Sequence, residues 1–197
     1  MRKVFLFLCF FSLFSALPAE AQRGALTRQQ TLDELVAESH VIIRGTVVSA
    51  RVEPHPTLSK IQTVVVRLRV EESLKGTATE TYEFRQFIWD ARDRLDAASY
   101  RKGQHLLLLL IAPNQYGLSS PAGLEQGRFR IQKDASGNEV AVNGNGNAGL
   151  FLGVQGRVAK KGIKLSATQA QLAESHTSGP VHAADLSAMI RQLAGVK

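Results

Sequence analysis

Residues 64–70 read Val-Val-Val-Arg-Leu-Arg-Val, and this stretch decides the fold class of the chain. The even-numbered positions are all apolar, whereas Arg67 and Arg69 stand between them. Side chains of a β-strand point alternately to opposite faces of a sheet, so one face of this strand is apolar and the other carries arginine. The stretch therefore predicts a strand of an antiparallel sheet that has one buried and one solvated face.

A second stretch predicts the centre of the same sheet. Residues 105–112 hold five consecutive leucines and an isoleucine. Gly103 and Pro113 flank the run and keep it short, which is typical of a central strand buried on both faces. A buried helix is the alternative, because an unbroken apolar run has no period that distinguishes the two.

Further strands are expected on both sides of these two. Residues 41–52 form a β-branched run that contains Gly45, and a glycine inside a strand often marks a bulge or a sharp bend. Residues 79–87 alternate aromatic and charged side chains, which also predicts a strand. Weaker alternation at 128–131 and 139–142 predicts two more strands.

Helices are expected at both ends of the strand region. Thr31-Leu32-Asp33-Glu34 has the form of a capping box and predicts a short helix that ends near Ser39. Residues 166–174 predict a second helix. A last helix is expected after Gly179-Pro180, with one apolar stripe along it. The stripe consists of Val181, Leu186, Met189, Ile190 and Leu193.

The order of these elements predicts a β-rich α+β fold, either an α+β domain or a small barrel with added helices. The glycine and asparagine segment 143–149 is expected to be a mobile loop outside the core.

The first 21 residues have the pattern of a cleavable secretory signal peptide. Arg2 and Lys3 precede an apolar run at 4–17, which is too short to span a bilayer as an anchor. Ala19-Glu20-Ala21 places small residues at the cleavage site, so cleavage between Ala21 and Gln22 is expected. We therefore predict that the protein is secreted or periplasmic and that it has no membrane anchor after cleavage. The expected division is 1–21 signal peptide, 22–165 β-barrel domain and 166–197 C-terminal helical segment.

Composition excludes several kinds of site from the mature chain. Cys9 is the only cysteine and leaves with the signal peptide, so disulfides, thiolate metal sites and a cysteine nucleophile are excluded. Removing residues 1–21 lowers the formal net charge from +7 to +6. The basic residues are scattered along the sequence and form no stripe, so we interpret the net positive charge as mainly a contribution to solubility. A nucleic-acid partner is not expected.

The chain resembles the netrin-like group of secreted OB-fold domains, which includes the tissue inhibitors of metalloproteinases, and uncharacterised exported bacterial proteins of that type. The resemblance spans residues 34–133 and rests on strand and turn segments. These are Glu38–Val47, Val66–Val70, Leu74–Gly76, Gly103 with Leu106–Leu110, and Gly127–Ile131. It implies a small OB-like antiparallel β-barrel with a short N-terminal helix and C-terminal helices.

One departure limits what this resemblance implies about function. In the inhibitors, a disulfide-bonded amino-terminal cysteine reaches the catalytic zinc of the protease. Here the expected first residue is Gln22, and the mature chain has no cysteine. The inhibitory mechanism is therefore not carried over, since a shared fold does not transfer function.

No motif of catalysis, metal binding or cofactor binding stands out. Residues 117–121 are similar to a nucleophile elbow, but Pro121 stands where the second glycine belongs. The five histidines lack the spacing of a zinc site. We expect no catalytic residues, no metal and no cofactor.

The candidate binding residues fall into two groups. Trp89 is the only tryptophan and opens a polar connection with Asp90 and Arg92, so it is a candidate anchor for a partner. The alternative is that Trp89 plugs one end of the barrel. The second group could line a groove across the sheet face. It consists of Arg67, Arg69 and Arg85.

These observations predict an exported, non-enzymatic binding or interaction module. The expected partner is a protein or an envelope polymer. Two alternatives remain open: an envelope hydrolase or carbohydrate-active accessory enzyme with a dispersed site of Asp, Glu and His, and a protease inhibitor by fold resemblance alone. An enzyme would be distinguished by a deep pocket with convergent titratable groups.

Overall fold

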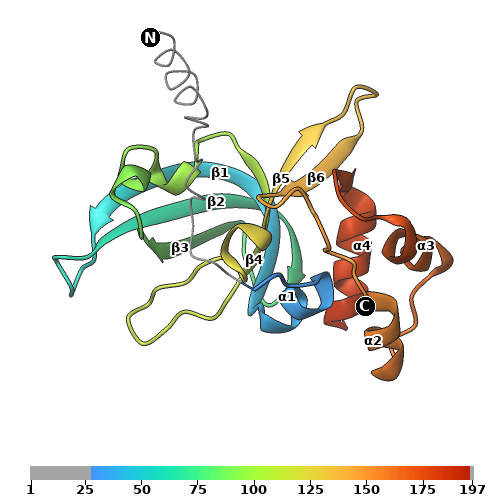
Figure 1. Ribbon diagram of the computed structural model, residues 1–197. Coiled ribbons are helices and arrows are strands. Elements are labelled where there is room, and N and C mark those ends of the chain that lie inside the picture. Colours follow the sequence, from blue (N-terminus) through green and yellow to red (C-terminus); the bar gives the residue numbers. More distant parts are fainter. Residues whose placement is uncertain (1–27, 196–197) are drawn as a thin grey trace, which may run out of the picture.

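The structure is a computed structural model, and it describes residues 28–195 (Figure 1). One seven-stranded antiparallel sheet, in the order β3-β2-β1-β4-β5-β6-β7, forms its centre. The strands are β1 (Val41–Pro54), β2 (Gln62–Lys75), β3 (Thr81–Phe87), β4 (His105–Leu110), β5 (Arg128–Lys133), β6 (Glu139–Asn143) and β7 (Val181–His182). The helices are α1 (Leu32–Glu38), α2 (Val154–Lys160), α3 (Ala167–Ser175) and α4 (Ala183–Ala194). The α+β class, the N-terminal helix and the C-terminal helices are as predicted.

The expected closed barrel is wrong. β3 and β7 are the two edges of the sheet, and they do not pair with each other. β3 instead meets the segment after β4 at one isolated bridge, where the Ser119 N–H donates to the Arg85 carbonyl at 2.8 Å. Pro113 and Pro121 bound this segment and have no N–H to donate, and between them only this one bridge to β3 forms, so the sheet stays open.

β4 divides its leucines between two apolar clusters on opposite faces of the sheet. Leu107 and Leu109 lie in a cluster with helices α1, α2 and α4, which we call the helix-side core. Leu106, Leu108 and Leu110 lie in a second cluster with β1, β2 and β3, which we call the inner core. All five leucines are at most 1% exposed, which confirms a central strand buried on both faces.

β1 bends at Gly45, as predicted. The β1–β2 register shifts between Arg44 and Gly45, which is the mark of a bulge. A Cβ atom at Gly45 would lie 2.2 Å from the Arg69 carbonyl oxygen of β2. Only glycine therefore allows the two strands to approach so closely here.

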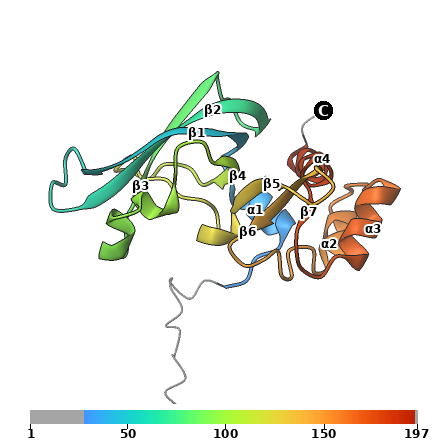
Figure 2. The same ribbon diagram turned by 90° about the horizontal axis from the view of Figure 1, so that it is seen from above.

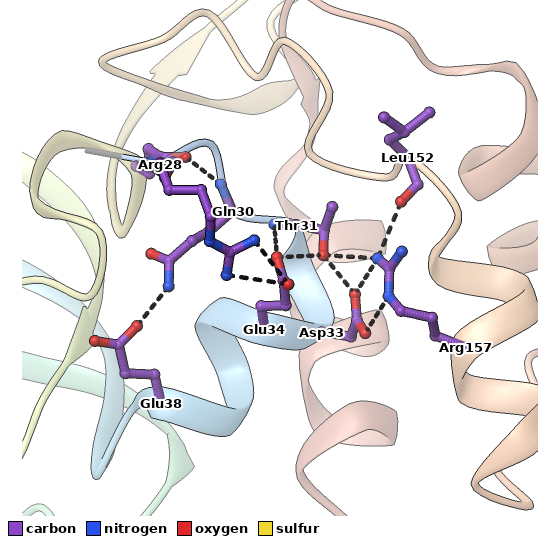
Figure 3. A network of polar contacts seen from close by, with 9 residues as sticks. Arg28, Gln30, Thr31, Asp33, Glu34, Glu38, Leu152 and Arg157 are labelled. Carbon is purple, nitrogen blue, oxygen red and sulfur yellow. Dashed lines mark hydrogen bonds and ion pairs between the residues drawn. The ribbon is translucent and has the colours of Figure 1, made fainter. Parts of the chain in front are cut away.

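A polar network joins α1 to α2 (Figure 3). The Glu34 carboxylate accepts from the Thr31 N–H at 2.9 Å, as the predicted capping box requires. The Asp33 side chain is only 4% exposed, and Arg157 of α2 binds both of its oxygens, at 2.9 and 2.7 Å. Burial alone would raise the pKa of Asp33, but hydrogen bonds from Arg157 and Thr31 hold it below its usual value.

The segment 143–149 packs against the core, contrary to expectation. Asn147 is fully buried, and its side-chain amide donates to the Ala141 carbonyl at 2.9 Å and the Gly179 carbonyl at 2.8 Å. Its side-chain oxygen accepts from the Asn143 N–H at 2.9 Å. Amide side chains thus satisfy the backbone groups that a buried turn would otherwise leave unpaired.

The last two helices, α3 and α4, follow the sequence pattern. α3 begins with a capping box formed by Ser166 and Gln169. The apolar stripe of α4 enters the helix-side core, where Leu186, Met189 and Ile190 are fully buried. Among residues 28–195 every helix is too short or too polar to cross a bilayer. The predicted signal peptide and its cleavage site lie outside the described residues.

Candidate functional site

The connection between β3 and β4, residues 88–104, presents large apolar side chains to solvent. It contains two short 3₁₀ turns, Ala91–Arg94 and Ala97–Ser99. Trp89 is 75% exposed and Leu95 is 92% exposed. In both views this connection lies at the end of the sheet away from α2 and α3 (Figures 1 and 2).

Trp89 does not close the inner core. Ile88 and Tyr100, which are 6% and 2% exposed, fill that place. The Tyr100 ring meets Phe84 edge-on at 5.8 Å, and the Arg128 guanidinium lies 4.8 Å above it. Burial raises the pKa of Tyr100 to about 12 despite the nearby guanidinium. The interpretation of Trp89 as a plug is therefore wrong, and Tyr100 has that role.

The backbone of this connection is held in an unusual conformation. Ala97, Ala98 and Ser99 all have positive φ angles, of 51°, 53° and 63°. Such angles are costly for residues other than glycine and persist only where neighbours fix them. Arg128 supplies one such contact, donating to the Ala98 carbonyl at 2.8 Å, and Asp96 accepts from the Ser99 hydroxyl at 3.0 Å. The connection is thus fixed from within the protein.

The predicted neighbours of Trp89 engage each other. The Arg92 Nε lies 3.0 and 2.9 Å from the two carboxylate oxygens of Asp90. Trp89 contacts Phe87 edge-on, with ring centroids 4.8 Å apart. Trp89 therefore stands on Phe87 at the end of β3, beside an ion pair that the chain supplies itself.

The three predicted arginines lie on the outer face of β2 and β3, opposite the inner core. Arg67 pairs with Glu83 at 3.1 Å, and Arg85 pairs with Glu53 at 2.6 Å. Arg69 lies two positions further along β2, opposite Thr81. Phe87 occupies the same face of β3 as Arg85, since the two are separated by one residue. The structure thus places the three arginines on the sheet face that also carries Phe87, the contact of Trp89, and two of the three arginines are paired with glutamates.

Sequence reasoning missed a cluster of titratable groups at the edge of the helix layer. His105 Nε2 lies 2.7 Å from Glu71 Oε2 and 3.2 Å from Arg44 Nε. Arg44 also pairs with Glu139, so side chains of β1, β2, β4 and β6 meet here. We call these four residues the His105 cluster. Its only sequence signals are two polar residues in or beside apolar strand segments, Arg44 and His105.

Neighbouring side chains stabilise the charged form of Glu71 in the His105 cluster. Burial alone would raise the pKa of Glu71, but the Thr46 hydroxyl at 2.8 Å and the neighbouring His105 outweigh it and lower this pKa. None of the cluster residues lines the cavities of about 420, 320 and 200 Å³ in the structure. Within residues 28–195 no group of three or more His, Cys, Asp or Glu side chains is arranged to hold a metal ion.

Comparison with known proteins adds no family assignment. No protein-family model, no curated protein sequence and no solved structure matches this chain.

Proposed function

We propose that this protein is an exported, non-enzymatic interaction module that binds a protein partner through Trp89 and the surface around it. The observation that carries the proposal is a tryptophan 75% exposed on a connection whose backbone is fixed by buried neighbours. A tryptophan supplies a large contact area at a low cost in side-chain entropy, and it is a frequent hot spot of protein interfaces.

The fixed backbone supports a binding role further. Ordering a loop upon association reduces affinity, so a connection that is already ordered binds more tightly. Leu95, at 92% exposure, adds a second apolar contact on the same connection. An aliphatic side chain fits an apolar pocket on a protein better than the hydroxyl-rich surface of a polysaccharide. A protein partner is therefore favoured over an envelope polymer.

We also propose that the fold is related to the netrin-like OB folds. This relation is supported by β1, which bends at Gly45 and pairs with both β2 and β4. The open sheet departs from a closed OB barrel, so no inhibitor mechanism is proposed from the resemblance.

A hydrolase is the less favoured function. Its best candidate site is the His105 cluster, where titratable groups do converge. Arg44 is paired with Glu139, His105 contacts Glu71, and none of the cluster residues lines the three cavities described above. Convergence of charges without a pocket is typical of a structural ion-pair network.

Trp89→Ala tests the proposal, with Leu152→Ala as a matched control. Leu152 is 72% exposed on a different part of the surface, so both changes remove a large exposed side chain. Each mature variant is immobilised and exposed to the native envelope fraction, and the captured proteins are identified by mass spectrometry. We expect one specific partner to bind the parent and Leu152→Ala but not Trp89→Ala, with all three melting temperatures equal.

Two results would contradict the proposal. The same partner captured by Trp89→Ala would show that Trp89 is not the anchor. A melting temperature of Trp89→Ala well below that of Leu152→Ala would show that Trp89 stabilises the fold instead.

A further inference from the structure

An apolar groove is lined by residues of α2, of α3 and of the segment between them. These two helices lie at the end of the molecule away from the β3–β4 connection (Figure 2). The volume of the groove is about 420 Å³, within the range of ~300–1,000 Å³ typical of small-molecule sites. Most lining side chains are apolar, and only one of them is charged. The apolar lining residues are Val158, Ala159, Ile163, Leu165 and Ala170, and the charged one is Lys164.

The two walls of the groove are built differently. α2 is fixed, because Val154 and Val158 are buried in the helix-side core and Arg157 binds Asp33 of α1. α3 has no fully buried residue, and only Leu172 and Ala173 pack partly against the core. The groove is therefore an open space beside a firm wall, which the chain does not fill with its own side chains.

One lysine lines the groove, and two more come at the end of its α2 wall in the sequence. Lys164 lines it, and Lys160 and Lys161 are next to lining residues in the sequence. Within residues 28–195 no ion pair joins any of these three lysines to a carboxylate. Glu174 is the only acidic residue between 152 and 175. The positive charge of Lys164 at the groove is thus available to an anion.

We propose that this groove binds a single anionic amphiphile, with its acyl chain along the apolar lining and its acid group at Lys164. Burial of acyl methylene groups against the apolar lining supplies the free energy of binding. Lys164 selects an anionic head group, since it would repel a cationic one. This site is independent of the Trp89 surface and of the function proposed for it.

Laurate below its micelle concentration is the probe, titrated calorimetrically into the full mature protein at neutral pH. Dodecyltrimethylammonium has an equally long chain with a cationic head and serves as the matched ligand. Lys164→Glu reverses the charge at the groove, and Lys60→Glu reverses it in the β1–β2 turn at the opposite end of the molecule (Figure 1). Ala159→Phe enlarges an exposed lining residue and occupies the groove.

We expect saturable 1:1 binding of laurate, and much weaker binding of the cationic ligand. Lys164→Glu should weaken laurate binding about tenfold, which corresponds to ~1.4 kcal/mol, while Lys60→Glu leaves it unchanged. Ala159→Phe should abolish it, with a melting temperature equal to that of the parent. The proposal is overturned by no saturable binding, by equal binding of both ligands, or by equal effects of the two charge reversals. Binding to anionic lipid vesicles without binding of free laurate would overturn it as well.

Discussion

Tyr100 is expected to ionise far later than a solvated tyrosine. Burial raises its pKa from 10.0 to about 12. Because the folded-state pKa lies above the unfolded one, the contribution to stability is complete below pH 10 and is lost as the pH rises toward 12. Burial also raises the pKa of Tyr82, so a near-ultraviolet absorbance titration should show Tyr82 as well as Tyr100 ionising late. Tyr100→Phe should remove the step near pH 12 and leave the Tyr82 step in place. A parent titration that is complete before pH 11 would contradict the buried position.

Arg157 is expected to matter for stability through the buried carboxylate that it neutralises. Arg157→Met keeps the aliphatic stem but leaves Asp33 buried without a cation. The free energy of unfolding should fall by ~3 kcal/mol. This is the lower end of the range for a broken buried ion pair, because the Arg157 side chain is 39% exposed. Arg28→Met is the control, since the Arg28–Glu34 pair is exposed and should contribute less than ~1 kcal/mol. Urea unfolding at neutral pH measures both.

Acid should reduce the difference in the free energy of unfolding between Arg157→Met and the parent. The pKa of Asp33 lies below its usual value of 3.8 in the folded protein, so its contribution is present at neutral pH and is lost as the pH falls below that value. Asp33→Asn in the Arg157→Met background should recover part of the loss, because a neutral amide needs no cation. An undiminished difference in acid would contradict this account.

Strand β4 should be sensitive to truncation on both of its faces. Leu107→Ala opens a cavity in the helix-side core, and Leu108→Ala opens one in the inner core. Each should cost ~2–5 kcal/mol in thermal unfolding. Leu95→Ala, at an exposed position, should stay within ~0.5 kcal/mol of the parent. A strand with one solvated face would instead give only one costly variant.

Elements with local signals could be predicted from the sequence, and elements that depend on distant partners could not. The capping box at Thr31 and the alternation at 64–70 are complete within a few residues, and both elements form as expected. α2 was missed because it begins after Gly153, contains Gly156 and has no side-chain cap. Its stability comes from Val154 and Val158 packing into a core that the rest of the chain builds.

In the candidate site, too, the local features could be predicted from the sequence and the long-range ones could not. The single tryptophan and the length of the polar connection after 87 were visible in the sequence, and they located the exposed surface at Trp89. Closure of the barrel depends on how residues 113–121 meet β3, and turn-rich segments give no pairing signal. The His105 cluster joins residues up to 95 positions apart, so no local pattern could reveal it.

At the scale of the whole molecule, the exported form should begin at Gln22. Ala19 and Ala21 satisfy the small-residue requirement of the cleavage site, so signal peptidase should remove residues 1–21. Intact-mass measurement of the exported protein checks this. Ala21→Arg places a large charged side chain at the cleavage site and should retain the segment. An exported parent that still carries Met1 would contradict the prediction.

The division of β4 between two apolar clusters has a consequence for how the molecule comes apart. The helix-side core and the inner core lie on opposite faces of one strand and share its backbone hydrogen bonds. Neither cluster can open by releasing β4 without also exposing the leucines of the other. The helices and the β1–β3 hairpins are therefore coupled into one cooperative unit that unfolds in a single transition, although among residues 28–195 no apolar cluster spans both sides of the sheet.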